Sequence, residues 1–187
     1  MKETLINITK AYIGESQARN RYTFYAKIAQ KEGYEQIAEV FLLTAEQEKA
    51  HAKRLFEHIQ ELKENNEEIK VEASAPTIYG TTIENLKAAI AGENYETTEM
   101  YPSFSRKAIE EGYEELGKRL AAIALAEKNH KERYEKLLMN LEEGTTFKKN
   151  EDTWWVCREC GYVHFGKEAP EKCPSCDHPQ AYYQVKL

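Results

Sequence analysis

Two glutamate–histidine pairs stand inside long helical stretches of this chain, where charge is not expected. In each pair the glutamate precedes the histidine by three residues, Glu48 before His51 and Glu127 before His130. The second pair repeats the first at an offset of 79, and the tripeptide EGY recurs at the same offset. The dipeptide GE recurs at an offset of 78. This agreement indicates one helical hairpin that is used twice.

The N-terminal part of the chain has the composition and apolar period of helices. The pattern predicts helices at 3–31, 34–64, 82–110 and 113–142. Gly33 and Gly112 mark the tight turns within the two hairpins, and a long polar segment crosses from one hairpin to the other. We therefore predict an all-α four-helix bundle.

Each predicted helix carries one glutamate on the apolar stripe that would face the bundle core. Counted from the first turn glycine, Glu15 stands at −18 and Glu48 at +15. Counted from the second turn glycine, Glu93 stands at −19 and Glu127 at +15. At ~1.5 Å of rise per residue, the members of each hairpin differ in height by about one helical turn. All four carboxylates can meet in the core.

Carboxylates that meet in an apolar core need cations, because each buried ion costs several kcal/mol. A lone core carboxylate is usually paired with arginine, and Arg19 and Arg21 stand near this level. Four carboxylates at one height, with two imidazoles beside them, instead predict two divalent metals. The donor set resembles that of ferritin-like bundles, in which two helices supply Glu and two supply Glu-x-x-His. Iron is the expected metal, with manganese similar in its choice of ligands.

Three further side chains fall near the predicted metals. Glu96 follows Glu93 by three and has no mate in the first hairpin. It is either a solvated or tyrosine-bonded glutamate, or an alternative oxygen donor for a ferric ion. Tyr22 and Tyr101 are mates at the offset of 79. They are either core aromatics or hydroxyl groups that hold a ligand carboxylate or give a proton. Pro102 should kink this helix beyond Glu96.

The composition changes near residue 145, which predicts a bundle domain at 1–145 and a second domain at 146–187. The second domain holds all the cysteines, in two C-x-x-C pairs: Cys157, Cys160, Cys173 and Cys176. Four thiolates predict a tetrahedral metal, either structural zinc or a single iron. On spacing alone a zinc ribbon is the commoner outcome.

The charge balance and the apolar runs exclude several classes of function. The formal net charge is −6, which argues against nucleic acid or an anionic membrane as a partner. No apolar run is long enough to cross a bilayer, and the first ten residues lack the apolar core of a signal peptide. We expect a cytoplasmic protein, in which paired cysteines bind metal rather than form disulfides.

The motifs together resemble the rubrerythrin family nearly end to end. They are GESQARNRY, EQEKAH, GENYETTEMYP, AEKNH, WVCRECGYVHFG and CPSCDHPQAYY. The resemblance implies a ferritin-like di-iron four-helix bundle followed by a rubredoxin-like domain with one iron on four cysteines. It favours iron over zinc at the cysteines.

The resemblance also implies roles for individual residues. Glu48 and Glu127 would bridge the two irons, and Glu15 and Glu93 would be terminal ligands. His130 would bind the second iron. The first iron would exchange His51 for Glu96 between the reduced and oxidised states. The full set of implied ligands is Glu15, Glu48, His51, Glu93, Glu96, Glu127, His130 and the four cysteines, with Tyr22 and Tyr101 as candidate catalytic phenols.

The implied activity is a di-iron peroxidase that reduces hydrogen peroxide in defence against oxidative stress. Electrons would come from NAD(P)H through a free rubredoxin or a flavoprotein reductase, and then through the rubredoxin-like iron. The resemblance also implies a head-to-tail homodimer or a higher homo-oligomer. Two other hypotheses stay open: a ferroxidase or iron-handling protein, and a bundle whose tail is a structural zinc ribbon.

Overall fold

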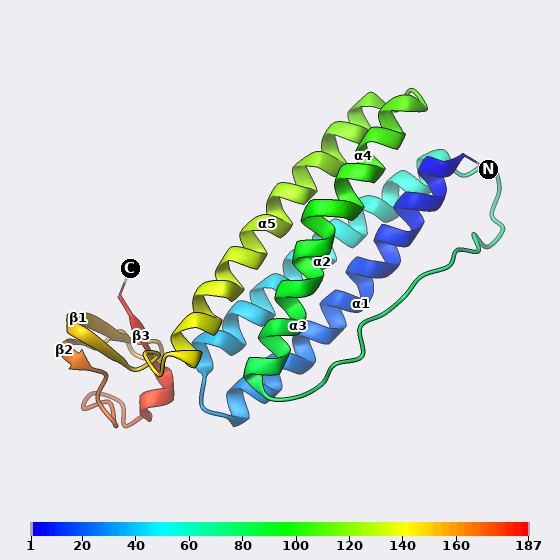
Figure 1. Cartoon of the computed structure of the whole chain (residues 1–187). Helices are drawn as coiled ribbons and strands as arrows, with labels where there is room; N and C mark the ends of the chain where they lie inside the picture. Colours follow the sequence, from blue (N-terminus) through cyan, green and yellow to red (C-terminus); the bar gives the residue numbers. More distant parts are fainter. Residues whose placement is uncertain (1, 187) are drawn as a thin grey trace.

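The chain folds as a helical bundle with a small sheet domain at one end (Figure 1), and the computed structural model describes residues 2–186. The helices are α1 (Glu3–Lys31), α2 (Glu35–Leu62), α3 (Thr82–Tyr95), α4 (Tyr101–Glu110) and α5 (Glu114–Glu142). A five-residue π-helix, Glu96–Met100, joins α3 to α4, so that the three segments form one long helix of the bundle. The predicted four-helix bundle is confirmed.

The bundle consists of two helical hairpins with the same turn. Gly33 and Gly112 have positive φ angles of 83° and 87°, a conformation that glycine adopts without the steric cost of a Cβ. In both turns the residue after the glycine donates its N–H to a carbonyl oxygen five residues earlier, at 2.8 Å. The predicted repeat of one hairpin is therefore present in the backbone as well as in the sequence.

The segment between the hairpins runs along the outside of α1 before it enters α3 (Figure 1). Tyr25 Oη donates to the carbonyl oxygen of Ile78 at 2.7 Å, which holds the end of the segment against the bundle. A capping box then starts α3, because Thr81 Oγ1 accepts from Glu84 N while the Glu84 carboxylate accepts from Thr81 N. The crossover thus fixes where the second hairpin begins.

The bundle interior has two apolar layers with an acidic layer between them. The layer nearer the sheet domain contains Ala18, Tyr22, Tyr25, Ala26, Ala29, Ile37, Ala38, Phe41, Ala45, Leu86, Ala88, Ala89, Tyr134 and Leu137. The far layer contains Leu5, Ile8, Ala11, Leu55, Ile59, Met100, Tyr101, Ala108, Leu116, Leu120, Ile123 and Ala124. The buried acidic residues of the bundle are Glu15, Glu48, Glu93, Glu96 and Glu127.

The C-terminal domain is a three-stranded antiparallel sheet in the order β2-β1-β3. Its strands are β1 (Lys148–Cys157), β2 (Val163–Glu168) and β3 (Tyr183–Val185). Trp155 fills its small core and donates Nε1–H to Gly166 O at 2.9 Å. The sequence predicted a four-cysteine metal site in this domain but not its strands.

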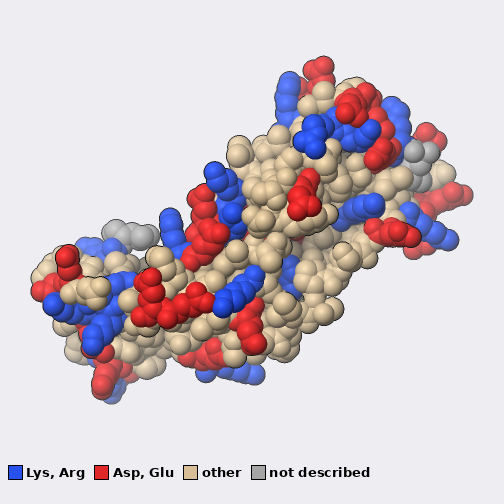
Figure 2. Space-filling view, in the orientation of Figure 1, with Lys and Arg blue, Asp and Glu red and all other residues tan. Residues whose placement is uncertain are grey.

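Two contacts seat the sheet domain on the end of the bundle. The rings of Tyr34 and Phe147 stack with centroids 6.2 Å apart and an interplanar angle of 10°. Arg158 forms an ion pair with Glu39 near the start of α2. Figure 2 shows basic and acidic side chains interspersed over this face of the molecule. Across residues 2–186, each helix is too short or too polar to cross a bilayer.

Replacement of Gly117 by alanine should destabilise the bundle. The new Cβ would lie 2.5 Å from Ile109 Cγ1 and 3.0 Å from Ser105 O, where α4 packs against α5. We expect Gly117→Ala to lower the free energy of unfolding by about 1–3 kcal/mol, as overpacked cores do. The control is Gly14→Ala in α1, where nothing lies within 4 Å of the added Cβ.

The control should instead gain up to about 1 kcal/mol from the higher helix propensity of alanine. Urea unfolding of both variants, followed by circular dichroism, measures the two changes. Effects of the same sign and size would contradict the close approach of the helices at Gly117.

Candidate metal centres

Four glutamates, one from each long helix of the bundle, point into the acidic layer. Glu15 comes from α1, Glu48 from α2, Glu93 from α3 and Glu127 from α5. Each is no more than 1% exposed. The heights deduced from the turn glycines therefore correspond to a real meeting point in the core, as the spacing predicted.

The donor atoms form two adjacent sets. In each set the donor atoms all lie within 4.8 Å of one another, a separation that suits a shared metal ion. The first set is Glu15, Glu48, His51 and Glu127, and the second is Glu48, Glu93, Glu127 and His130. Glu48 and Glu127 belong to both sets, so they stand where bridging carboxylates would stand.

The two imidazoles lie against the shared carboxylates. His130 Nδ1 is 2.7 Å from Glu127 Oε2 and 3.0 Å from Glu48 Oε1. His51 Nδ1 is 2.9 Å from Glu127 Oε1 and 3.1 Å from Glu48 Oε2. Nitrogen and oxygen atoms that converge in this way can be ligands of the same ion. The sequence predicted both histidines at these places.

Many of these atoms lack the hydrogen bonds that buried polar groups need. The buried atoms without a hydrogen-bond partner in the described chain include Glu15 Oε2, Glu48 Oε1, Glu93 Oε2, both carboxylate oxygens of Glu127, and His130 Nδ1. Leaving such groups unpaired in a core is costly. Two divalent cations would satisfy them together, and the mixed oxygen and imidazole donors suit iron.

The nearby arginines do not neutralise this layer. Arg21 is 7% exposed and donates to Gln17 Oε1 at 3.0 Å. Arg19 lies 3.8 Å from the surface carboxylate of Glu46. These four glutamates are therefore not paired with Arg19 or Arg21, which was the alternative for a single glutamate in the core.

Burial and mutual repulsion shift the carboxyl groups. Burial, reinforced by the charges of Glu48 and Glu127, raises the pKa of Glu15 well above its usual range. Burial raises the pKa of Glu93 to about 7, although His130 opposes the shift. Glu96 behaves like Glu15, with burial and then the charge of Glu93 raising its pKa well above normal. The layer holds more negative charge than its own residues can balance.

The imidazoles respond in the opposite sense. Burial opposes their protonation, but the carboxylates of Glu127 and Glu48 close to the ring nitrogens raise the pKa of His51 to about 9 and that of His130 to about 12. Burial would likewise raise the pKa of Glu48, yet the two imidazoles lower it to about 2. Without metals, the shared carboxylates therefore hold protons on the histidines. Metal binding must displace these protons.

Two buried phenols support the outer carboxylates. Tyr22 Oη donates to Glu93 Oε1 at 2.6 Å, and Tyr101 Oη donates to Glu15 Oε1. Both tyrosines are 1% exposed or less. They lie in equivalent places of the two hairpins, on the two sides of the acidic layer. The predicted tyrosines therefore contact the site.

Glu96 begins the π-helical segment and lies beside the two donor sets rather than inside them. Glu15 precedes Tyr22 by seven residues, whereas Glu93 precedes Tyr101 by eight. The second hairpin thus carries one extra residue, which the helix absorbs as a π turn. In the sequence, the inserted residue is visible only as a change in the repeat offset, from 78 between Glu15 and Glu93 to 79 between Tyr22 and Tyr101. A difference of one residue is easily read as ordinary agreement between the two repeats.

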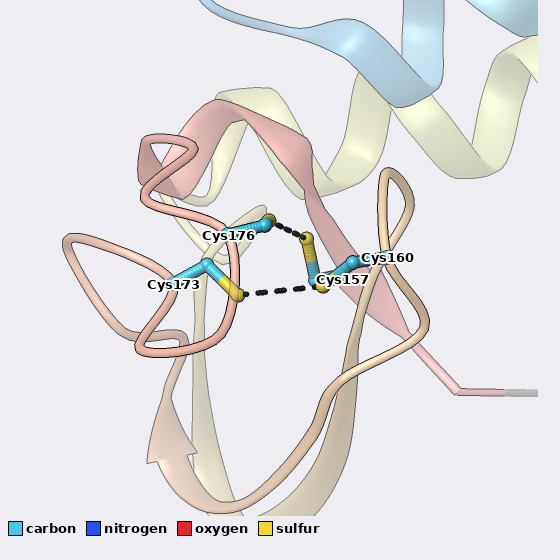
Figure 3. Close-up of side chains that lie close together, drawn as sticks. All are labelled: Cys157, Cys160, Cys173 and Cys176. Atoms are coloured by element: carbon cyan, nitrogen blue, oxygen red, sulfur yellow. Dashed lines mark hydrogen bonds between the residues drawn. The ribbon is translucent and has the colours of Figure 1, made fainter.

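The four cysteines of the C-terminal domain converge from two loops (Figure 3). The Sγ atoms of Cys157 and Cys176 are 3.7 Å apart, as are those of Cys160 and Cys173. Burial opposes ionisation of Cys173, but the Tyr183 hydroxyl and backbone N–H groups lower its pKa to about 6. Four sulfur atoms that converge in this way fit one tetrahedral metal ion.

The two cysteine loops share one backbone turn. Gly161 and Asp177 follow the second cysteine of their pairs and have positive φ angles of 77° and 62°. Each donates its N–H to the carbonyl oxygen of the first cysteine, at 2.8 Å and 3.0 Å. The repeated turn aims both pairs of thiols at one point.

The stability of the metal-free protein should fall as the pH rises. The pKa of Glu93 rises from 4.5 to about 7, so between these values the unfolded chain releases a proton that the folded chain keeps. The raised pKa of His51 stabilises the fold below 6.5, and this contribution is lost as the pH rises through about 9. Both effects have the same sign.

Thermal melting of metal-free protein from about pH 5 to about pH 9 measures this effect. Metal-loaded protein should depend less on pH, because bound cations stabilise the ionised carboxylates. Glu93→Gln should remove part of the dependence. A melting temperature that does not change with pH would contradict the crowding of charge in this layer.

Deletion of Thr98 should be tolerated. It would remove the extra residue, convert the π turn to α-helix and leave Tyr101 in register with Glu15. Deletion of Asn20, an exposed residue of the regular helix α1, should instead rotate all later residues of α1 by about 100° and unfold the hairpin. Melting curves compare the two proteins, and equal destabilisation would contradict the proposed register.

Comparison with known proteins matches both parts of the chain. Residues 7–138 match the family described as rubrerythrin, and residues 155–184 match the family described as rubrerythrin, rubredoxin-like domain. A Methanocaldococcus jannaschii protein named as a rubrerythrin is 61% identical, and the match covers 100% of this chain and 94% of that protein. Rubrerythrin from Nitratidesulfovibrio vulgaris is 47% identical, with 96% and 92% covered.

Solved structures agree with these matches. A structure described as the partially reduced state of nigerythrin is 35% identical, with a TM-score of 0.67 over 100% of this chain and 88% of that one. The bacterioferritin BfrA of Mycobacterium tuberculosis is 19% identical with a TM-score of 0.66, over 76% of this chain and 90% of that one, and shows the ferritin-like fold alone. The chain therefore belongs to the rubrerythrin family, oxidoreductases of oxidative-stress defence that hold a di-iron site and a rubredoxin-like iron site.

Proposed function

We propose that this protein reduces hydrogen peroxide to water in the acidic layer of the bundle, with electrons supplied through the four-cysteine iron. The observation that carries the proposal is the pair of donor sets that share Glu48 and Glu127. Two ions held this way lie side by side, and peroxide has two oxygen atoms to bind. The reaction takes two electrons and two protons for each peroxide and gives two waters.

The proposed ligands follow from the donor sets. Glu48 and Glu127 would bridge the ions, and Glu15 and Glu93 would bind one ion each at the outer positions. His51 would complete the first site and His130 the second. Two ferrous ions at these residues would supply the two electrons that cleave the oxygen–oxygen bond, so that no hydroxyl radical is released. The cysteines would hold the third iron.

His51 and Glu96 are the proposed exchanging pair. His51 lies inside the first donor set, while Glu96 is buried beside it at 8% exposure. An imidazole suits ferrous iron, and a carboxylate suits ferric iron better. Glu96 would therefore replace His51 on oxidation, and the extra residue of the π turn would give its backbone the room to do so.

Tyr22 and Tyr101 are the proposed phenols of the reaction. Each donates its hydroxyl proton to an outer carboxylate, Glu93 or Glu15. They fix the orientation of those carboxylates, and they can pass a proton through them toward the peroxide oxygens. Because burial raises the pKa of both phenols well above normal, each keeps its proton until the reaction needs it.

The source of electrons and the assembly are parts of the same proposal. The donor would be a free rubredoxin or a flavoprotein that oxidises NAD(P)H. Within one chain the four cysteines lie beyond the first turn of the bundle, and Glu48 stands at +15 from the glycine of that turn. At ~1.5 Å per residue this is roughly 20 Å. A head-to-tail homodimer would shorten the path of the electrons from the four-cysteine site to the acidic layer. The proposed boundary between the two domains lies between residues 145 and 146.

Two other functions compete with the peroxidase. A ferroxidase or iron-handling protein would need iron to enter and leave, and it would have no use for a redox site on four cysteines. A zinc ribbon would leave the C-terminal domain colourless, whereas ferric thiolate is red. Metal analysis and the visible spectrum of protein purified without air separate these cases.

The reaction with peroxide tests the proposal directly. The iron-loaded protein is reduced without air and mixed rapidly with hydrogen peroxide or dioxygen, and the oxidation of iron is followed by absorbance. We expect peroxide to react much faster than dioxygen. Glu96→Ala should still bind its metals but react roughly 10- to 100-fold more slowly, a cost typical of residues that tune a metal centre.

The matched control is Glu99→Ala, which removes an exposed glutamate from the same π-helical segment. It should react at the rate of the unchanged protein. Faster oxidation by dioxygen than by peroxide would favour the ferroxidase and overturn the proposal.

A further inference from the structure

A cluster of phenols lies between the acidic layer and the crossover segment. Tyr22 has its ring centroid 6.2 Å from that of Tyr25 and 5.6 Å from that of Tyr134. Phe41 touches all three rings, at 5.9, 5.6 and 5.0 Å from Tyr22, Tyr25 and Tyr134. All four side chains are 1% exposed or less. The rings form one continuous contact.

The cluster has one end at the candidate metals and the other near the surface. Tyr22 donates to the carboxylate of Glu93 at 2.6 Å. Tyr25 donates to the carbonyl oxygen of Ile78 at 2.7 Å. Ile78 is 52% exposed, and the next residue, Tyr79, is 64% exposed. Two phenols in ring contact therefore span the distance from a carboxylate of the site to an exposed segment.

The duplicated hairpin supplies an internal comparison. Tyr22 has a phenol as its mate, Tyr101, on the other side of the acidic layer. At the same offset of 79, the mates of Tyr25, Phe41 and Tyr134 are in that order Phe104, Leu120 and Leu55. At these three positions the far half therefore packs its core with apolar side chains. A ferritin-like bundle does not need the extra phenols in order to fold.

The hydroxyl of Tyr134 adds to the difference between the two halves of the bundle. It is buried, and although Thr44 lies beside it, it has no hydrogen bond of good geometry among the described residues. A buried hydroxyl in this state destabilises the fold, a cost that phenylalanine at the same place would avoid. Buried polar groups left unpaired in native proteins call for an explanation, and a redox role is one of the recognised ones. Phenols can lose one electron under conditions in which phenylalanine cannot.

We propose that Tyr22, Tyr25 and Tyr134 form an exit for single oxidising equivalents, leading from the acidic layer to the surface at Ile78. The inference rests on the proposed function, because hydrogen peroxide is the oxidant. It concerns the case in which peroxide receives one electron instead of the two that the proposed reaction needs. A centre that holds only one electron cannot complete the reduction, and it leaves a radical that would damage the core.

The electrons and protons of the exit balance. Hydrogen peroxide that receives one electron gives hydroxide and a hydroxyl radical. Tyr22 gives the radical one electron, which forms a second hydroxide, and passes its proton to Glu93. Tyr22 then takes an electron from Tyr25 and its proton back from Glu93, while Tyr25 releases its own proton to solvent as its hydroxyl separates from the Ile78 carbonyl oxygen of the exposed crossover. A thiol or ascorbate in solution returns one electron and one proton to Tyr25.

Tyr134 has a different part in the cluster. It contacts Tyr22 but, unlike Tyr25, has no bond to the crossover. It therefore serves as a second phenol that can hold the oxidising equivalent while Tyr25 is being reduced. The hydroxyl of Tyr134 lacks the well-formed hydrogen bond that Tyr25 makes, so Tyr134 is the harder phenol to oxidise and the oxidising equivalent moves on to Tyr25.

The test uses the full-length iron-loaded protein, reduced to one electron for each di-iron site. Samples are mixed with hydrogen peroxide, frozen within milliseconds and examined by electron paramagnetic resonance. Protein made with ring-deuterated tyrosine identifies a phenoxyl signal. We expect a phenoxyl radical in the unchanged protein, and ascorbate should remove it rapidly. In Tyr25→Phe the radical should persist in the presence of ascorbate.

A matched control and a second readout accompany this test. Tyr12→Phe alters a tyrosine whose ring packs on Phe56 at 5.3 Å, outside the cluster, and it should behave as the unchanged protein. Peptide mass spectrometry measures oxidation of Met100, which lies in the other apolar layer. This oxidation should increase in Tyr25→Phe and in Tyr134→Phe but not in the control. Iron content and melting temperature verify that each variant folds.

The outcomes separate this inference from the proposed function. Rapid oxidation of fully reduced protein by peroxide, with no phenoxyl signal in the one-electron sample, would overturn the exit and leave the peroxidase intact. A phenoxyl signal that responds to Tyr25→Phe, together with slow oxidation of the fully reduced protein, would support the exit and overturn the peroxidase. Equal signals and equal damage in all the variants would overturn the exit.

Discussion

The structure depends on a layer of negative charge that the protein cannot neutralise by itself. The shared carboxylates of Glu48 and Glu127 face two imidazoles, but Glu93 has only a phenol and the more distant His130, and Glu15 has only a phenol. Apolar layers on both sides keep water away from them. The stability of the fold therefore depends on the metal centre, because the helices bury carboxylates at one point and bound cations are needed to make that burial favourable.

Most of this layer could be predicted from the sequence, because helices convert spacing into position. Once Gly33 and Gly112 fixed the turns, the heights of Glu15 and Glu127 followed from the rise of a helix. The π turn could not be located in this way, since a count of residues does not show where an inserted one is absorbed. The strands were missed because cysteine spacing predicts a metal but not the sheet that carries it. The unpaired hydroxyl of Tyr134 depends on side-chain packing, which periodicity does not describe.

The repeat is informative where it fails. The two hairpins have the same turns and the same glutamate–histidine pairs, so each difference between them adds something that the bundle itself does not require. Glu96 adds a fifth buried carboxylate on one side of the two donor sets. The residues around Phe41 add phenols on the other side. These differences lie on either side of the acidic layer and leave the shared carboxylates of Glu48 and Glu127 unchanged.

The ion pair between Arg158 and Glu39 answers a question that a duplicated bundle raises. Two identical turns would present the C-terminal domain with two equivalent docking surfaces, here called seats, one at each end of the bundle. Position 39 has its mate at 118, which is lysine, so the second seat would repel Arg158 rather than attract it. The second turn is instead covered by the N-terminus, where Lys2 lies 4.5 Å from the ring of Tyr113. The charge reversal reinforces the path of the chain, because α5 runs away from the second turn and residues 143–147 leave the C-terminal domain beside the first one.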